Sequence, residues 1–410
     1  MQPGQNHKLS QNFNRLAWSN LFAQSAEQIA LAAAPLVAVL LLGATASQVG
    51  WLQFALTLPF LVVAVPAGLI ADRIPRQRLM AYAESVRAIS LVAIVALLAT
   101  DQLNLPVLAL LGLIGVCGTV VFTVAAPALV PSLVPSALFG RANARLELAG
   151  TSAFVAGPAI GGALVGWTGA PAAFGLATCL SIWATFLLVR VSEPEREPVI
   201  GRRPIRDIVE GAAFVFGNEL LAPVFITQFI FNAAFFALMA VFVPHAVQNL
   251  GLSATETGVV MSFLGVGMLC GAFIAPRVLS AIRFGHVISV GPVCGFVASL
   301  LMVATIWMPS FSIAAIGFFL LGIGPTLWVI STNTLRQSIT PDALLGRVSA
   351  INVMARGARP IGAGIAAVTA GAFGLEACLF LAAFGFGAQA ITILSSPTTS
   401  LSSQPVKSAA

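Results

Sequence analysis

The chain consists of long apolar runs separated by short polar turns. Twelve runs are long enough to cross a bilayer as helices, since a span needs about 20 apolar residues. They lack the alternating pattern of membrane β-strands. The pattern predicts an all-α polytopic membrane protein with spans near residues 17–42, 47–71, 79–99, 105–130, 145–168, 170–191, 220–248, 256–276, 285–306, 310–335, 346–371 and 373–396.

Only one connection between the predicted spans is long, and it divides them into two groups of six. We expect an N-terminal bundle at 1–191, a linker at 192–219, a C-terminal bundle at 220–396 and a disordered tail at 397–410. Both bundles carry a related segment, Pro135–Arg141 in the first and Pro341–Arg347 in the second, about half a chain length apart. Such spacing indicates a duplicated six-helix unit.

The linker has a helical pattern of its own. Apolar residues recur at helical spacing from Ile205 to Phe216, with Arg206 and Glu210 between them. This pattern is typical of an amphipathic helix at the membrane surface. The helix either couples the two bundles or is only a solvated connector.

Composition strengthens the membrane interpretation. Of the 410 residues 58% are hydrophobic and 8% are charged, with a mean hydropathy of +0.97, whereas soluble proteins carry about 25% charged residues. The net charge is +6, but 17 of the 20 Lys and Arg residues fall at the termini or in the turns after even-numbered spans. The positive-inside rule therefore places both termini in the cytoplasm and explains the charge without nucleic acid.

Little in the chain points to an enzyme. A phosphate-binding loop needs a lysine, and the only lysines are Lys8 and Lys407. The three histidines are far apart, and the five cysteines lie in apolar runs without a CxxC pair, as small buried residues would. We expect no catalytic residues, no cofactor and no metal.

One charged turn separates the second and third spans. It reads Gly68-Leu-Ile-Ala-Asp72-Arg73-Ile-Pro75-Arg76-Gln-Arg78. With the twelve spans and duplicated halves, this segment resembles the signature loop of the major facilitator superfamily. The resemblance implies two pseudo-symmetric six-helix bundles. It also implies a cytoplasmic gate that closes through Gly68, Asp72, Arg73, Arg76 and Arg78 and opens when Asp72 is neutralised. Alternatively, the charges only fix the orientation.

The fifth span contains a second motif. The pattern Pro135…Leu138…Ala142-Asn143…Gly157-Pro158…Gly161-Gly162 is similar to that of drug and siderophore exporters of the enterobactin-exporter and macrolide-efflux type. The family associates Gly157, Pro158, Gly161 and Gly162 with exchangers that export. Alternatively, small residues there serve ordinary helix packing.

Ionisable residues at membrane depth are costly and usually functional. Glu27 lies ten residues into the first span, beside Gln24 and Gln28. A carboxylate shielded from water can bind and release a proton, so Glu27 is our candidate for proton coupling or cation binding. A helix–helix hydrogen bond or an ion pair with an arginine is the alternative.

Arg356 and Arg359 share one face of the eleventh span and need counter-charges. Glu27 could supply one, or an anionic group of the substrate, which favours a catecholate siderophore over a cationic drug. Structural pairing is the alternative. Further polar side chains suited to a transport path are Gln228, Asn232 and Asn333.

The fourth span departs from the family pattern. Many proton-driven exporters of the superfamily carry an arginine there, but residues 105–130 hold no charge. Arg356 or Arg87 is the substitute that the sequence offers. Arg87 follows Glu84 at i, i+3, a spacing that favours a local gating or structural pair nearer the cytoplasm.

Together these features predict a secondary active transporter of the cell inner membrane. It would export a small amphipathic molecule, drug-like or siderophore-like, by alternating access with protons as the coupling ion, and work as a monomer. Two alternatives stand beside it: a lipid or lysolipid transporter of the same fold, and a non-transporting receptor or scaffold.

Overall fold

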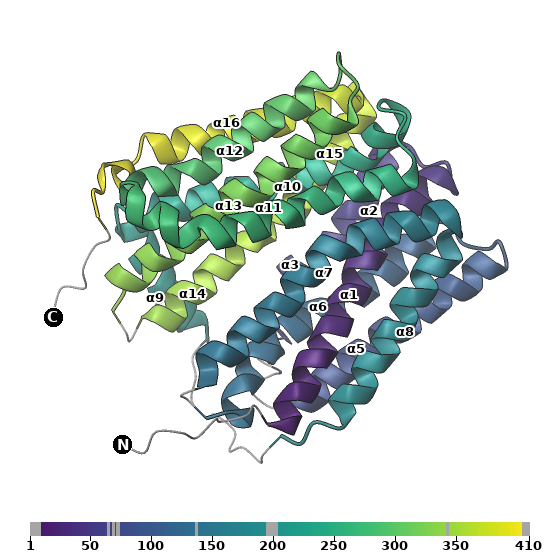
Figure 1. Cartoon of the computed structure of the whole chain (residues 1–410), viewed down its shortest axis with the longest axis horizontal. Helices are drawn as coiled ribbons and strands as arrows, with labels where there is room; N and C mark the ends of the chain where they lie inside the picture. Colours follow the sequence, from purple (N-terminus) through teal and green to yellow (C-terminus); the bar gives the residue numbers. More distant parts are fainter. Residues whose placement is uncertain are drawn as a thin grey trace.

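The computed structural model describes residues 10–63, 66–67, 70, 74–135, 138–193, 204–341 and 344–403. All regular structure in these ranges is helical (Figure 1), which confirms the all-α fold. We call residues 10–193 the N-half and residues 204–403 the C-half.

The N-half contains α1 (Gln11–Leu40), α2 (Ala46–Thr57), α3 (Pro59–Val62), α5 (Arg76–Ala99), α6 (Leu105–Leu133), α7 (Phe139–Trp167) and α8 (Ala170–Val189). The C-half contains α9 (Pro204–Gly217), α10 (Leu221–Gln248), α11 (Ala254–Ala281), α12 (Phe284–Ala304), α13 (Phe311–Ile339), α14 (Leu345–Met354), the 3₁₀ helix η2 (Ala355–Gly357), α15 (Ala358–Phe373), α16 (Leu375–Leu394) and the 3₁₀ helix η3 (Pro397–Ser400).

Among the described residues, ten helices are long and apolar enough to cross a membrane. The part of the predicted span 47–71 up to Val62 forms the shorter helices α2 and α3, and the predicted span 346–371 is divided into α14, η2 and α15. Proline explains both interruptions, because it has no N–H to donate and its ring crowds the carbonyl four residues earlier. Pro59 begins α3, and Pro360 lies in the first turn of α15, which begins directly after η2.

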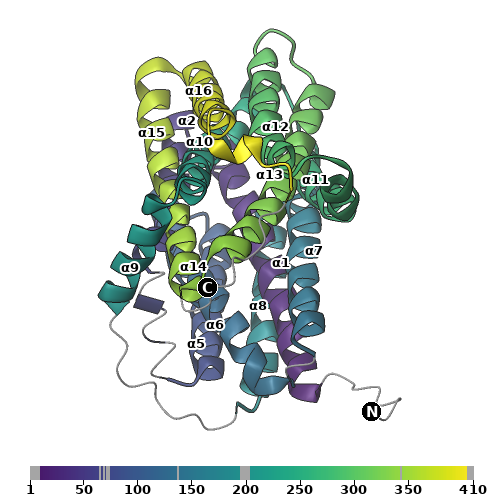
Figure 2. The ribbon, with the colours of Figure 1, turned by 90° about the vertical axis from the view of Figure 1, so that its left-hand side faces the viewer.

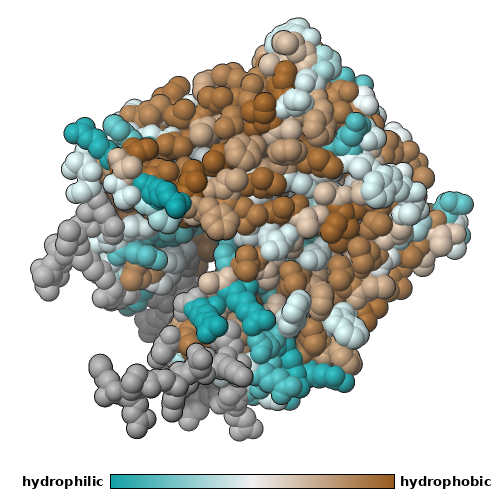
Figure 3. All heavy atoms as spheres, in the orientation of Figure 1, coloured by the Kyte–Doolittle hydropathy of each residue, from teal (hydrophilic) through white to brown (hydrophobic). Residues whose placement is uncertain are grey.

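The two halves meet at the end of the molecule away from the chain termini (Figure 1). There α2 packs on α15, and the Ser47 hydroxyl donates to the Ala367 carbonyl at 2.8 Å. A Cβ added at Gly50 would lie 2.7 Å from the Ala367 Cα, so only glycine permits this approach. Toward the termini the surface is hollowed between the halves, while apolar residues cover the flanks (Figure 3).

The flanks fit contact with lipid. Trp167, Phe373 and Phe384 each expose three quarters or more of their surface (78%, 79% and 76%). A single exposed aromatic is ordinary, but the many large apolar side chains that this chain exposes are typical of a membrane-facing surface.

The linker helix α9 lies beside α14 of the C-half (Figure 2). Glu210 forms ion pairs with Arg206, at 2.8 Å, and with Arg347 of α14. Close packing accompanies them, since a Cβ at Gly211 would lie 2.8 Å from the Arg347 carbonyl oxygen. The preceding linker residues 194–203 lie outside the described ranges.

The expectation of a disordered tail from residue 397 is wrong for residues 397–403. These residues form η3 and continue along the start of α12, where Gly285 N–H donates to the Leu401 carbonyl at 2.9 Å. Thr398 is fully buried. Serine and threonine hydroxyls donate to nearby backbone carbonyls here, and the polar composition of the tail does not reveal these hydrogen bonds.

Candidate functional site

Glu27 is buried near the middle of α1, with 8% of its surface exposed. Neighbouring polar residues of α1 serve packing: Asn20 donates to the Leu146 carbonyl of α7 at 3.0 Å, and Ser19 donates to the Ala184 carbonyl of α8 at 3.1 Å. Gln28 packs against α7, because a Cβ at Gly157 would lie 2.4 Å from its Cβ. Glu27 itself faces Arg87, Glu84 and Thr119.

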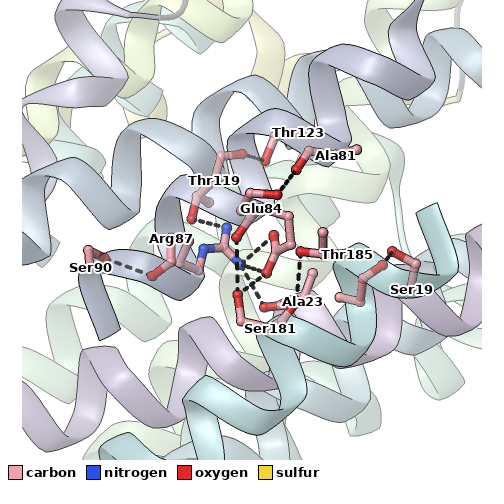
Figure 4. A network of polar contacts seen from close by, with 12 residues as sticks. Ser19, Ala23, Ala81, Glu84, Arg87, Ser90, Thr119, Thr123, Ser181 and Thr185 are labelled. Carbon is pink, nitrogen blue, oxygen red and sulfur yellow. Dashed lines mark hydrogen bonds and ion pairs between the residues drawn. The ribbon is translucent and has the colours of Figure 1, made fainter. Parts of the chain in front are cut away.

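A buried polar network centred on Arg87 and Glu84 joins four helices (Figure 4). Both of these residues act on the charge of Glu27. Arg87 on α5 pairs with Glu84 at 3.1 Å and donates to the Ala23 carbonyl of α1 at 2.9 Å. It also donates to the Thr119 hydroxyl of α6 at 2.6 Å. The second carboxylate oxygen of Glu84 accepts from Ser181 of α8, also at 2.6 Å. The network holds the side chains of Glu84 and Arg87 in place.

Glu84 and Arg87, which we expected as a local pair nearer the cytoplasm, lie beside Glu27. Their side chains are 0% and 4% exposed, inside the bundle. Arg87 is the arginine that contacts the uncharged fourth span, through Thr119. The i, i+3 spacing correctly predicted the pair, but a single sequence could not show that Glu27 lies next to it.

A cavity with an empty volume of about 430 Å³ opens beside these groups, within the N-half. Its polar end is formed by Glu27, Arg87 and Thr119. The remaining lining is mostly aliphatic and comes from α1, α2, α5 and α6 together with Phe174 of α8. A few convergent polar groups in an apolar cavity are typical of a ligand or ion site.

A second cluster lies in the C-half and combines three of the predicted residues. Arg359 of α15 donates through Nε to Asn232 Oδ1 of α10 at 3.2 Å. Asn232 in turn donates to the Gln228 carbonyl at 2.8 Å, which orients its amide. The guanidinium of Arg359 also lies over the rings of Phe60 and Phe236, 4.6 and 5.0 Å from their centroids.

Other predicted residues lie elsewhere. Asn333 accepts from Arg336 of its own helix α13, apart from the Arg359 cluster. Arg356 is half-buried and its charge interacts with Glu147. Neither Arg356 nor Arg359 forms an ion pair with Glu27 among the described residues, although the charge of Arg359 acts on Glu27.

Part of the predicted gate lies outside the described ranges, namely Gly68, Asp72 and Arg73. Arg76 and Arg78 begin α5. Between them, Gln77 anchors this end of α5 to the end of α8: its N–H donates to Glu193 at 2.9 Å and its amide to the Leu188 carbonyl at 2.7 Å. The latch itself stays a prediction.

The glycine motif of α7 contacts both halves. Gly161 packs on α1, where an added Cβ would lie 3.0 Å from the Ile29 carbonyl oxygen. Gly162 packs on α11 of the other half, with the corresponding distance to the Ala254 oxygen at 2.5 Å. Gly258 of α11 returns the contact, since its Cβ would lie 2.4 Å from the Pro158 oxygen.

Residues 16–367 match the sequence model described as Major Facilitator Superfamily, across most of the chain. The chain belongs to this superfamily. Among its relatives, the uncharacterized MFS-type transporter y4rN of Sinorhizobium fredii is 28% identical over 338 residues, 78% of this chain and 79% of the relative. The multidrug efflux pump Tap of Mycolicibacterium fortuitum is 27% identical over 337 residues, 78% and 80% of the two chains.

Another relative of this superfamily member is the enterobactin exporter EntS of Escherichia coli, 24% identical over 284 residues, 69% of this chain and 67% of the relative. The fold resembles a solved bacterial homologue of the lysosomal transporter Spinster in an inward-facing, unoccupied conformation. The TM-score is 0.72 at 16% identity, covering 97% and 98% of the two chains. The protein is therefore a multi-pass membrane transporter, not an enzyme.

Proposed function

We propose that this transporter exports small amphipathic molecules in exchange for protons, with Glu27 as the proton-binding residue. The observation that carries the proposal is the burial of two carboxylates, Glu27 and Glu84, around the single guanidinium of Arg87. One buried guanidinium balances one carboxylate, and an uncompensated charge is costly inside a membrane protein. One proton resolves the imbalance.

The surroundings favour Glu27 as the group that takes this proton. Glu84 is held by Arg87 and Ser181 and is fully buried. Glu27 instead lines the cavity, from which a proton or water can reach it. Thr119 connects Arg87 with Glu27. The Thr119 oxygen accepts a hydrogen bond from Arg87, so the Thr119 hydroxyl proton is available to donate to the Glu27 carboxylate. Protonation of Glu27 removes the negative charge that strengthens this hydrogen bond and so weakens the contact between α1 and α6.

Transport would follow from rocking of the two halves around their shared interface. With the termini in the cytoplasm, as the distribution of Lys and Arg favours, the hollow between the halves (Figure 3) faces the cytoplasm. The glycine contacts of α7 with α11 form the outer closure. Export is supported by the efflux relatives, which are named for drug and enterobactin export.

The test uses purified protein in proteoliposomes with an imposed pH gradient. Three dyes serve as substrates: cationic ethidium, anionic carboxyfluorescein and neutral Nile red. We expect the gradient to drive uptake or release of at least one dye by the wild type. Glu27→Gln would still exchange that dye down its own gradient but no longer respond to pH.

Glu219→Gln is the matched control, because Glu219 is an exposed carboxylate at the start of the C-half bundle. It should behave as the wild type. Gradient-driven transport by Glu27→Gln at the wild-type rate would remove Glu27 from the coupling role. Absence of transport of every dye by the wild type would contradict the proposed function itself.

A further inference from the structure

Arg359 occupies an unusual position for a membrane-embedded cation. It lies in the first turn of α15, directly after the 3₁₀ turn, and is partly buried. Its guanidinium carbon lies over the ring of Phe60 from the N-half and over the ring of Phe236 from the C-half. Both ring distances are within the range of about 6 Å for a cation–π interaction.

The hydrogen bonds of Arg359 leave its charge unneutralised. Its Nε donates to the neutral Asn232 amide oxygen at 3.2 Å. Within the described part of the chain, no carboxylate lies within ion-pair distance of Arg359. Its two terminal nitrogens bind no acceptor there, and they are not among the fully enclosed unpaired atoms. They therefore face accessible space.

The wider surroundings of Arg359 are also electropositive. Arg356, three residues earlier, acts on Arg359 as a second positive charge. Among the described residues, the acidic group whose charge acts on Arg359 is Glu27 of the other half. A guanidinium at membrane depth is costly without a partner, and two ring faces offset only part of that cost. A ligand anion would complete the site.

We propose that Arg359 binds the acidic group of an amphipathic organic anion, whose aromatic or apolar body lies against Phe60 and Phe236. The planar guanidinium offers its two terminal nitrogens as a fork, which matches a carboxylate, sulfonate or phosphate better than a neutral or cationic group. Because the two rings come from different halves, the ligand would lie where the halves meet. This assignment of a substrate class rests on the proposed function.

The test measures equilibrium binding without any gradient, so it does not depend on proton coupling. Purified transporter in phosphatidylcholine nanodiscs is titrated with naphthalene-2-carboxylate and with its uncharged isostere naphthalene-2-carboxamide. We expect the wild type to bind the carboxylate at least about tenfold more tightly, because the guanidinium forms stronger hydrogen bonds with a charged acceptor than with a neutral one. This comparison needs no variant to fold.

Variants then locate the site. Arg359→Gln should lower carboxylate affinity about tenfold and leave carboxamide affinity unchanged, and Arg359→Lys should recover part of the loss. Arg277→Gln, at an exposed arginine of α11, is the control and should change neither. Equal wild-type affinity for the two probes, or an Arg359→Gln variant that keeps the preference for the carboxylate, would overturn the proposal.

Two sources could supply the anion, a dissolved organic acid or an acidic lipid head group. Adding phosphatidylglycerol to the nanodiscs distinguishes them: competition with the carboxylate indicates a lipid occupant of the same site, and no competition indicates a dissolved acid. If the anion binds but no gradient drives transport, the proposed function fails and this site remains. If only neutral or cationic dyes are transported and the anion does not bind, the anion site is excluded and the proposed export function remains.

Discussion

Arg87 of α5 donates a 2.6 Å hydrogen bond to the hydroxyl of Thr119 on α6. The same guanidinium donates to the Ala23 carbonyl of α1 and pairs with Glu84. One side chain thus connects three membrane spans at the depth of Glu27. Arg87 forms its ion pair with Glu84, and this pair determines how the site responds to mutation.

Removing one partner of the buried ion pair should cost far more stability than removing both. Arg87→Gln leaves the buried Glu84 carboxylate without its cationic partner, and we expect a loss of about 3–5 kcal/mol in the free energy of unfolding. The double variant Glu84→Gln/Arg87→Gln should recover a large part of this loss. Unfolding in detergent, followed by tryptophan fluorescence, measures both. Glu376→Gln, at an exposed carboxylate, is the control; additive losses in the double variant would contradict the pairing.

The Thr119 hydroxyl should matter for both stability and proton response. Thr119→Val keeps the shape but deprives Arg87 of an acceptor, so we expect a loss of about 1 kcal/mol in stability. The pH dependence of dye transport should also shift, because Glu27 loses a neighbouring hydroxyl. Thr123→Val removes only a bond to the backbone of its own helix and serves as the control. Identical behaviour of the two variants would exclude a special role for Thr119.

Gly162 should control closure between the halves. Alanine there would place its Cβ 2.5 Å from the Ala254 oxygen, an overpacking that costs about 1–3 kcal/mol and disfavours the closed interface. A disulfide between cysteines at positions 47 and 371 reports closure, since the Ser47 hydroxyl lies 3.1 Å from a Cβ built at Gly371. In a background without native cysteines, Gly162→Ala should slow cross-linking.

Gly175→Ala provides the matched control for that experiment. Nothing lies within 4 Å of its added Cβ, so cross-linking should proceed at the wild-type rate. Equal slowing by both alanines would show that helix propensity rather than contact between the halves is being measured.

Docking of α9 should weaken in acid. Hydrogen bonding to Arg206, together with the charge of Arg347, lowers the pKa of Glu210 below its usual 4.5. The ion pairs therefore stabilise the docked helix fully above about pH 4.5, and this stabilisation is lost as the pH falls through the lowered pKa. Hydrogen exchange of the α9 amides between pH 3 and 7, corrected for intrinsic rates, measures the effect.

Glu210→Gln should abolish this acid dependence by removing the titrating group, and Glu219→Gln should retain it. A Glu210→Gln variant with the wild-type pH profile would mean that other groups hold α9 against α14.

Hydropathy was sufficient for the helical class and for most spans, because a span is defined by local composition. It could not reveal the interruptions near Pro59 and Pro360, since prolines such as Pro158 and Pro276 lie within continuous helices of the same molecule. Glu27 was identifiable from its depth alone. Its proximity to Arg87 was not identifiable from the sequence, because the two residues meet only when α1 and α5 pack together. The ring contacts of Arg359 likewise come from residues far apart in sequence.

The attachment of α9 to α14 moves the boundary between the two halves upstream. The linker helix belongs structurally to the C-half, so a chain break within residues 194–203 would separate two self-contained pieces rather than cut through a coupling element. The two pieces would associate through the helix contacts at Ser47 and Ala367 and at Gly162 and Gly258. The protein is thus a natural candidate for expression as two polypeptides that assemble in the membrane, each free to be labelled or mutated by itself.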